Sequence, residues 1–240
     1  MALLETSNLH VRFKLFEGIS HVLNGVNLKI ERGERVAIVG ESGCGKSLTI
    51  RAMLGLLRQR NVAIEGGVRF DGTELLSLPE RSWRTIRGRR ISMIFQDLSA
   101  ALNPTFTVGD QLLKVIIRGG SARGKRHARE IARTALRQVA ITDPDRVLHS
   151  YPFQLSGGLA QRVLITMALV NKPDLVLADE PTGNLDSETG AAIVDLMFDI
   201  QARDGSTLLL ITHDDAVAER CKRIVQMNDG RLHDAPTGRL

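Results

Sequence analysis

The chain has 240 residues and a mass of 26.4 kDa, and it is 43% hydrophobic and 25% charged. This composition excludes collagen, coiled coils and wholesale disorder, and the length suits one large domain or a core with a smaller subdomain. Aromatic residues make up only 4% of the chain. We therefore predict an aliphatic core that needs no disulfide or metal to hold it together.

The charge balance is mildly basic, with a net charge of +5 and a pI near 9.6. Such a balance admits partners that carry phosphate, including nucleic acid, anionic lipid and nucleotides. Part of the excess lies in two clusters, which we interpret first as solvated faces. The clusters are Arg81, Arg84, Arg87, Arg89 and Arg90, and then Arg118, Arg123, Lys125, Arg126, Arg129 and Arg133.

Cysteine usage and hydropathy indicate the compartment. Cys44 and Cys221 lie far apart and fit neither a disulfide framework nor a zinc site, so a reducing cytosol is the simplest expectation. No apolar run approaches the roughly 18 residues that a membrane span needs. The opening MALLETSNLH lacks the basic and apolar regions of a signal peptide. We expect a soluble chain that reaches any membrane through a partner.

Strand-like and helical segments alternate along most of the chain. The runs that begin at Arg35, Leu175 and Leu208 are short and continuously apolar, which is typical of strands buried on both faces of a parallel sheet. This alternation predicts an α/β core built from crossover units. The predicted strands are Leu3–Phe13, His21–Ile30, Arg35–Val39, Val68–Phe70, Ile91–Phe95, Leu175–Ala178, Leu208–Thr212 and Ile224–Met227, and the predicted helices are Ser47–Leu57, Ser156–Val170 and Ser187–Arg203.

Three regions depart from that alternation. Before Gly40 the pattern is two β segments joined by a polar turn, with no room for a helix. Residues 108–151 show only helical patterning, which predicts an all-helical insertion in the core. The segment Asp229–His233 predicts a tight turn into a last short strand, followed by a frayed tail.

A phosphate-loop pattern, G-x-x-x-x-G-K-[ST], follows the apolar run that ends at Val39 and precedes a predicted helix. The glycines of this motif let backbone N–H groups turn inward around a phosphate, and the helix N-terminus adds a partial positive charge. We predict that Lys46 reaches the β- and γ-phosphates and that Ser47 offers its hydroxyl to Mg²⁺. The predicted nucleotide-binding residues here are Gly40, Glu41, Ser42, Gly43, Cys44, Gly45, Lys46, Ser47 and Leu48.

Two carboxylates close the apolar run that begins at Leu175. Asp179 is predicted to hold the Mg²⁺ shell, and Glu180 is placed to orient or deprotonate the water that attacks the γ-phosphate. A strand that simply ends in two solvated acids is the alternative, and a complete phosphate loop in the same chain makes it weak.

Further motifs resemble those of ATP-binding-cassette (ABC) ATPases. Residues 155–162, Leu-Ser-Gly-Gly-Leu-Ala-Gln-Arg, resemble the LSGGQ signature of that family. Gln96 matches its Q-loop glutamine, Asn184-Leu185-Asp186 resembles its D-loop, and His213 resembles its switch histidine. The resemblance covers essentially the whole chain. It implies a P-loop NTPase (RecA-like) core with an N-terminal antiparallel β subdomain and an all-helical insertion.

The resemblance also implies roles. The signature residues Ser156, Gly157, Gly158 and Gln161 would bind the γ-phosphate of an ATP held by the other subunit, so that two chains sandwich two ATP molecules head to tail. His213 would contact the γ-phosphate in cis and help hold the attacking water. Gln96 would sense Mg²⁺ and water, and Asp186 would help align the opposing subunit. The implied catalytic residues are Glu180, His213 and Gln96, and the implied Mg²⁺ ligands are Ser47, Gln96 and Asp179.

An aromatic residue near the N-terminus usually stacks on adenine in this family. Phe13 is the best candidate and Phe16 the second, since stacking needs only a π-face. A core role for Phe13 is an equal alternative. Ala160 stands in the signature where many relatives carry a polar or charged residue, and we expect activity to survive because Ser156 and the glycines are intact.

We predict one ABC ATPase domain over residues 1–240. Residues 1–95 and 172–240 would form the β subdomain and the RecA-like core. Residues from about 96 to 171 would hold the Q-loop, the helical subdomain and the signature helix.

The segment after the Q-loop, residues 95–111, resembles the dipeptide, oligopeptide and nickel importer branch, and Arg87-Gly88 and residues 151–158 support the same branch. Residues 181–186, Pro-Thr-Gly-Asn-Leu-Asp, resemble instead the lipoprotein-release and macrolide-export branch. The chain also lacks the C-terminal extension common in peptide importers, whereas nickel-type importers are often shorter. We favour import of nickel, a metal chelate or a di- or oligopeptide.

An export ATPase and a soluble, non-transport ABC ATPase remain as alternatives. The second would suit the basic clusters, but such proteins generally carry two cassettes or long coiled-coil insertions. The resemblance implies ATP and Mg²⁺ as cofactors and a second ABC ATPase subunit, identical or different, as partner. It also implies transmembrane permease subunits, an extracytoplasmic substrate-binding protein acting indirectly, and no nucleic acid. The expected place is the cytoplasmic face of the cell membrane.

Overall fold

The computed structural model describes residues 2–57, 59–97 and 101–234, and its backbone divides into two compact units. The first unit comprises residues 1–83 and 207–240, and the second comprises residues 84–206. Helix α2 (Glu80–Ile86) begins in the first unit and ends in the second. The sequence predicted one ATPase domain whose core resumes at residue 172, after the helical insertion. That division of the chain stays a prediction.

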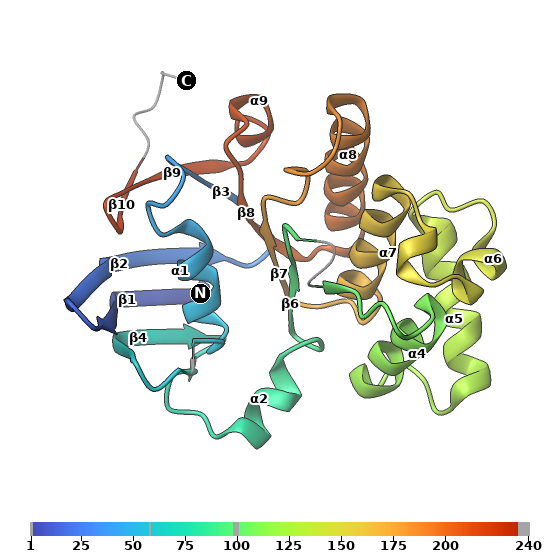
Figure 1. The fold of residues 1–240 in the computed structure, drawn as a ribbon, viewed down its shortest axis with the longest axis horizontal. Helices are drawn as coiled ribbons and strands as arrows, with labels where there is room; N and C mark the ends of the chain where they lie inside the picture. The colour runs from blue at the N-terminus through green and yellow to red at the C-terminus, as the bar shows by residue number, and fades with distance from the viewer. Residues whose placement is uncertain (1, 58, 98–100, 235–240) are drawn as a thin grey trace. The chain divides into compact units, whose positions relative to one another are not determined.

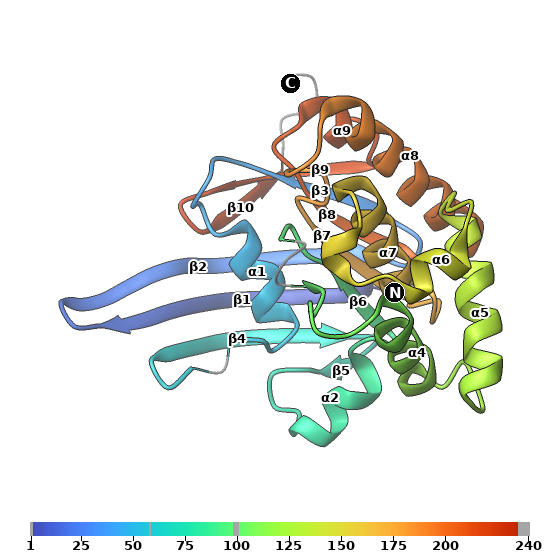
Figure 2. The same cartoon turned by 45° about the vertical axis from the view of Figure 1, so that its right-hand side comes forward.

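The first unit contains an antiparallel sheet with the strand order β2-β1-β4-β5, as predicted for the N-terminal segment. Figure 1 shows β1, β2 and β4 side by side, and Figure 2 shows β1 and β2 as a long hairpin. Strand β4 is longer than predicted because it continues through Gly66, where a Cβ would lie 2.3 Å from the carbonyl oxygen of Asn8 on β1. The strands are β1 (Ala2–Leu15), β2 (Gly18–Glu31), β4 (Val62–Phe70) and β5 (Thr73–Glu74).

The same unit contains four further strands in the order β10-β9-β3-β8. Strand β3 is parallel to β8 and to β9, with Ile38 paired to Ile211 on one side and to Val225 on the other. The tight turn predicted before β10 is present, since Asp229 and Gly230 both adopt positive φ, as in a two-residue hairpin. The strands are β3 (Arg35–Val39), β8 (Thr207–Ile211), β9 (Arg223–Asn228) and β10 (Arg231–Asp234).

Two helices belong to this unit, α1 (Lys46–Met53) and α9 (Asp215–Ala218). Helix α1 ends before its predicted limit at Leu57. Gly55 has φ +59, and the N–H of Leu56 donates to the carbonyl oxygen of Arg51. This arrangement is a left-handed helix ending of the kind glycine favours.

The second unit contains the parallel pair β6 (Ile91–Ile94) and β7 (Leu175–Asp179), in which Ile94 pairs with Ala178. The other elements that its described residues form are helical, so the all-helical insertion is confirmed. Figure 1 shows α4, α5, α6 and α7 gathered together. The helices are α4 (Val108–Gly119), α5 (Lys125–Gln138), α6 (Pro144–His149), the 3₁₀ turn Pro152–Gln154, α7 (Gly157–Leu169) and α8 (Ser187–Asp204).

Burial in the insertion follows the helical period. On α5, Ala128, Ala132 and Leu136 are fully buried and lie four residues apart, so they share one face of the helix. Lys125, Arg126 and Arg129 of the second basic cluster are exposed on the same helix. In the first basic cluster, Arg89 donates to the carbonyl oxygen of Gly119 at 2.8 Å and Arg90 pairs with Asp174 at 2.8 Å, so these two arginines have structural partners.

One ion pair anchors the turn between β2 and β3 to the start of β9. The Glu34 carboxylate accepts Nε of Arg223 at 2.9 Å and the backbone N–H of Glu31 at 2.8 Å. Burial raises the pKa of Glu34, but the hydrogen bonds from Arg223 and Glu31 outweigh it and hold that pKa below its usual value of 4.5.

Because the folded-state pKa is lowered, the stability that Glu34 contributes is present above about pH 4.5 and is lost as the pH falls through the folded value. We expect Glu34→Gln to lower the free energy of unfolding by ~1.5–3 kcal/mol at pH 7, the size of one charged hydrogen bond. Denaturant unfolding at pH 7 and at steps below pH 4.5 measures this, with Glu17→Gln in the exposed hairpin turn as control. A deficit that stays constant with pH would contradict the assignment.

Candidate functional site

The phosphate-loop motif lies between β3 and α1 in the first unit, the position that the sequence predicts. Gly40 has φ +151, and a Cβ there would lie 2.3 Å from the carbonyl oxygen of Met227 on β9. Gly45, the N-cap of α1, has φ +111, and a Cβ there would lie 2.9 Å from Cδ2 of Leu23. Both positions therefore require glycine. The loop is exposed over Glu41, Ser42 and Gly43, while Ser47 and Leu48 lie half-buried in the first turn of α1.

Lys46 folds back over its own loop. Its Nζ donates to the carbonyl oxygens of Gly40 at 2.7 Å and of Glu41 at 2.8 Å, and lies 4.0 Å from Sγ of Cys44. Lys46 is only 6% exposed, so these carbonyl oxygens replace water around the ammonium group. A buried cation held at the mouth of a glycine loop is suited to receive a phosphate oxygen.

The turn between β9 and β10 holds the loop from the other side. The N–H of Gly230 donates to the carbonyl oxygen of Cys44 at 3.1 Å, and Nδ2 of Asn24 donates to the backbone carbonyl oxygen of Asp229 at 2.8 Å. The sequence predicts the turn but not this support, because residues 24, 44 and 230 are far apart in the chain.

His213 follows β8 at the same sheet edge as the phosphate loop. Ile211 of β8 pairs with Ile38 of β3, so the loop after β3 and the segment after β8 leave the carboxyl ends of adjacent parallel strands. The exit of β8 is fixed, because the N–H of Asp214 donates to Oγ1 of Thr212 at 3.0 Å and Asp214 caps α9. His213 is exposed between these anchored residues.

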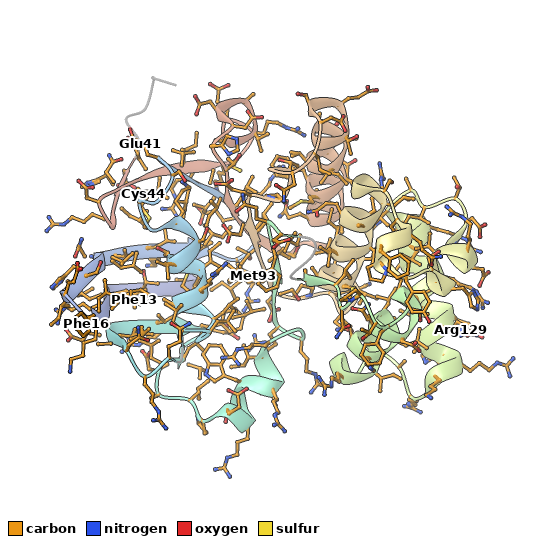
Figure 3. All side chains as sticks on the ribbon, viewed as in Figure 1. Phe13, Phe16, Glu41, Cys44, Met93 and Arg129 are labelled. Atoms are coloured by element: carbon orange, nitrogen blue, oxygen red, sulfur yellow. The ribbon has the colours of Figure 1, made fainter. Side chains whose placement is uncertain are left out.

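Figure 3 shows Phe13 and Phe16 toward the hairpin end of β1 and β2, with Glu41 and Cys44 on the phosphate loop. Phe13 is half-buried in β1, where it pairs with Ser20 of β2 and Val62 of β4. Phe16 lies in the hairpin turn with its side chain fully exposed. Adenine stacking by Phe13 stays a prediction.

The catalytic residues predicted in the second unit follow its two strands. Asp179 ends β7 and is 2% exposed, and Glu180 follows it with φ +43, a strained value for a residue that is not glycine. Gln96 lies two residues beyond Ile94, just as Glu180 lies two residues beyond the paired Ala178. The structure brings these two side chains together, since Nε2 of Gln96 donates to Oε2 of Glu180 at 3.2 Å.

The signature residues open helix α7. Ser156 is its N-cap and accepts the N–H of Leu159 at 3.4 Å, and Gly157 and Gly158 form the first turn. A Cβ on Gly158 would lie 2.9 Å from Cγ2 of Thr189, so α7 approaches the start of α8 closely there. The first turn thus offers backbone N–H groups and the positive end of a helix, as predicted for an anion site.

Gln161 occupies a different environment from its three companions in the predicted signature set. It is 1% exposed, and its Nε2 donates to the carbonyl oxygen of Pro181 at 2.6 Å. Within this chain it joins α7 to the segment that follows β7. The other three members of the set, Ser156, Gly157 and Gly158, lie at the N-terminal end of α7.

Asp186 of the predicted D-loop is the N-cap of α8. Its carboxylate accepts the N–H of Thr189 at 2.9 Å, and this hydrogen bond holds the pKa of Asp186 below its usual value. An additional role toward an opposing subunit stays a prediction. The branch-specific segment after Gln96 includes Leu98, Ser99 and Ala100, which lie outside the described residues.

Oxygen donors for Mg²⁺ are present in both units. Ser47 contributes a hydroxyl, Asp179 a buried carboxylate and Gln96 an amide oxygen, all groups that Mg²⁺ accepts. The described residues contain no cluster of three or more His, Cys, Asp or Glu side chains that could hold a metal ion. Each of these three groups is an oxygen donor of the kind that Mg²⁺ takes beside water and phosphate oxygens.

The two cysteines lie in contrasting environments. Cys44 is half-buried on the phosphate loop, whereas Cys221 is buried, and its burial raises the pKa of its thiol to about 11. We expect N-ethylmaleimide to modify Cys44 first, MgATP to slow that reaction, and Cys221 to react only after unfolding, since the thiolate is the nucleophile. Mass spectrometry of the labelled peptides measures this, with Cys44→Ser as control. Faster labelling of Cys221, or labelling of Cys44 that ATP leaves unchanged, would contradict it.

Comparison of the chain with known proteins identifies its family. The family model described as "ABC transporter" matches residues 23–183. The probable peptide ABC transporter ATP-binding protein y4tR of Sinorhizobium fredii (strain NBRC 101917 / NGR234) is 44% identical over 96% of this chain and 69% of that protein. The dipeptide transport ATP-binding protein DppD of Bacillus subtilis (strain 168) is 42% identical over 98% of this chain and 70% of that protein.

Solved structures agree. The dimeric post-hydrolysis structure of the ATP-binding cassette MJ0796, bound to ADP and Pi, is similar to this chain with a TM-score of 0.84 and 33% identity, over 96% of this chain and 98% of that one. The predicted P-loop NTPase fold is thereby confirmed. Among the described residues, none of the helices has the length and apolar character that a membrane crossing requires. The chain belongs to the ABC transporter family, as one of its ATP-binding subunits.

Proposed function

We propose that this chain is the ATP-hydrolysing subunit of an importer of di- or oligopeptides. The observation that carries the substrate class is the set of relatives named for peptide transport. Beyond the two above, DppD of Escherichia coli (strain K12) is 39% identical over 97% of this chain, and OppD of Bacillus subtilis is 38% identical over 98%. Their names describe dipeptide and oligopeptide transport, and similarity over nearly the whole chain supports the same class here.

The proposed ATP site combines the groups described above. The phosphate loop, residues 40–47, surrounds the β- and γ-phosphates with backbone N–H groups, and Lys46 exchanges a loop carbonyl for a phosphate oxygen. Glu180 accepts the proton of the attacking water, and His213 contacts the γ-phosphate and helps to hold that water. Phe13 stacks on the adenine.

Mg²⁺ would be held by Ser47, Asp179 and Gln96, and when bound it neutralises charge on the phosphates. In a dimer, Ser156, Gly157 and Gly158 of one chain would bind the γ-phosphate held by the other through the positive end of α7. Asp186 would align the opposing subunit. Closure of two chains around two ATP molecules would then drive the permease.

The proposed partners are a second ABC ATPase subunit, identical or different, and transmembrane permease subunits. An extracytoplasmic substrate-binding protein would deliver the substrate to the permease. The chain would lie at the cytoplasmic face of the cell membrane, held there by the permease. No nucleic acid partner is proposed.

Uptake measurements test the substrate class. A strain without this chain should lose uptake of a radiolabelled dipeptide, and the wild-type chain but not Glu180→Gln should restore it. The same strains are assayed with ⁶³Ni²⁺. Loss of nickel uptake with intact peptide uptake would assign the chain to nickel import, and accumulation of peptide in the deletion strain would indicate export.

A further inference from the structure

The segments that follow β6 and β7 are joined by more than the contact between Gln96 and Glu180. Nδ2 of Asn184 donates to the backbone carbonyl oxygen of Gln96 at 3.0 Å. Gln96, two residues beyond the end of β6, is therefore held twice by the segment after β7, through its side chain at Glu180 and through its backbone at Asn184.

The backbone of residues 180–185 is shaped for this contact. Glu180 starts the segment in the left-handed region, and the N–H of Gly183 then donates to the carbonyl oxygen of Glu180 at 3.1 Å. The N–H of Leu185 donates to the carbonyl oxygen of Thr182 at 3.0 Å, which makes a second turn. These turns return the chain toward Gln96, so Glu180 and Asn184 reach the same residue.

Gly183 lies beside this pair of side chains. A Cβ at this position would lie 3.4 Å from Nε2 of Gln96 and 3.5 Å from Oε2 of Glu180, which is ordinary van der Waals contact. The turn that presents Asn184 therefore also borders the carboxylate and the amide. Small displacements of the loop after β6 would change the direction in which the Glu180 carboxylate points.

We propose that Asn184 is a positioning residue for ATP hydrolysis: by holding the carbonyl oxygen of Gln96, it fixes the amide that orients the Glu180 carboxylate. The proposal rests on the proposed function of Glu180 as the residue that activates water. Asn184 also lies two residues before Asp186, the N-cap of α8. It therefore ties the loop after β6 to the segment that would face the opposing subunit in a dimer.

The test is a double-mutant cycle on ATP hydrolysis, measured on the full chain with the subunits that purify with it. Asn184→Ala should lower kcat about fivefold, the factor that one ordinary hydrogen bond corresponds to, with an unchanged KM for ATP. Asn184→Asp keeps the size and the turn preference of the side chain, but a carboxylate cannot donate a hydrogen bond to Gln96. It should lower kcat by the same factor. In a Gln96→Ala background Asn184→Ala should cause no further loss, because the side chain it positions is gone.

The matched control is Asn171→Asp. Nδ2 of Asn171 also donates to backbone carbonyl oxygens, at 2.9 Å to Gly88 and 3.2 Å to Val115, in the same unit. This substitution should lower the melting temperature and leave kcat and KM unchanged. Full activity of Asn184→Asp, or losses from Asn184→Ala and Gln96→Ala that multiply, would overturn the proposal.

A separate measurement distinguishes failure of the proposed function. If Glu180→Gln retained hydrolysis, the premise about Glu180 would be wrong whatever the cycle gave. If Glu180→Gln abolished hydrolysis while the Asn184 variants behaved as wild type, only the positioning role would fail. Melting temperatures of all variants show whether a loss of kcat reflects unfolding.

Discussion

Glu180→Gln is expected to trap an ATP-bound dimer that hydrolyses almost nothing. The substitution keeps the size of the side chain and its ability to contact Gln96, but an amide cannot accept the proton of the attacking water. Removal of a general base costs about 10²–10⁴-fold in rate. ATP binding should survive, because the phosphate loop and Lys46 are unchanged, so the state that normally ends with hydrolysis should accumulate. Size-exclusion chromatography with ATP, and an ATPase assay on the same sample, measure the two effects.

The control for this experiment is Glu219→Gln, an exposed glutamate that directly follows α9. It removes the same charge and should leave dimerisation and hydrolysis unchanged. A Glu180→Gln chain that stayed monomeric in ATP, next to an active wild type, would refute the sandwich arrangement. Hydrolysis within tenfold of wild type would refute the role of Glu180.

Local sequence predicted the buried strands well because each one is an uninterrupted apolar run. Strand β3 has the predicted bounds, Arg35–Val39, and β7 extends the prediction by only one residue. The sequence patterns did not predict the extent of elements that depend on tertiary contacts. Strand β4 passes through Gly66 and Gly67, which interrupt any alternating pattern, yet β1 pairs with it on both sides of that point. The short α2 and α9 were not predicted, because neither is long enough to show a clear period.

In the candidate site, too, local sequence predicted the contiguous motifs but not the contacts between distant segments. The phosphate loop and the signature could be located in the sequence because each is a contiguous motif, and in the phosphate loop Gly40 and Gly45 adopt the positive φ that favours glycine. The environments of Gln161 and Asn184 were not, since one donates to Pro181 and the other to Gln96, contacts that depend on how distant segments meet. The sequence identified Asn184 only as part of the predicted D-loop, and the structure adds a hydrogen bond from its side chain to the backbone of Gln96.

Lys46→Ala is expected to weaken nucleotide binding and hydrolysis together. The substitution changes only the side chain between Gly45 and Ser47, so the loop glycines and the Ser47 hydroxyl stay in place. What is removed is an ammonium group whose present partners are loop carbonyl oxygens, at 2.7 and 2.8 Å. A charged hydrogen bond to phosphate contributes ~1.5–3 kcal/mol, which corresponds to about 10- to 150-fold in Kd. Equilibrium titration with a fluorescent ATP analogue measures the affinity.

The geometry of Lys46 also predicts a second effect that a purely catalytic lysine would not show. Because the buried ammonium group bridges Gly40 and Glu41, its removal leaves those two carbonyl oxygens without that donor, and the nucleotide-free chain should melt at a lower temperature. Lys14→Ala, which removes an exposed lysine from β1, should change neither quantity. Unchanged ATP affinity and hydrolysis in Lys46→Ala would refute the assigned phosphate contact, whereas an unchanged melting temperature would refute the bridging role alone. The two measurements thus separate what Lys46 does for the loop from what it does for the nucleotide.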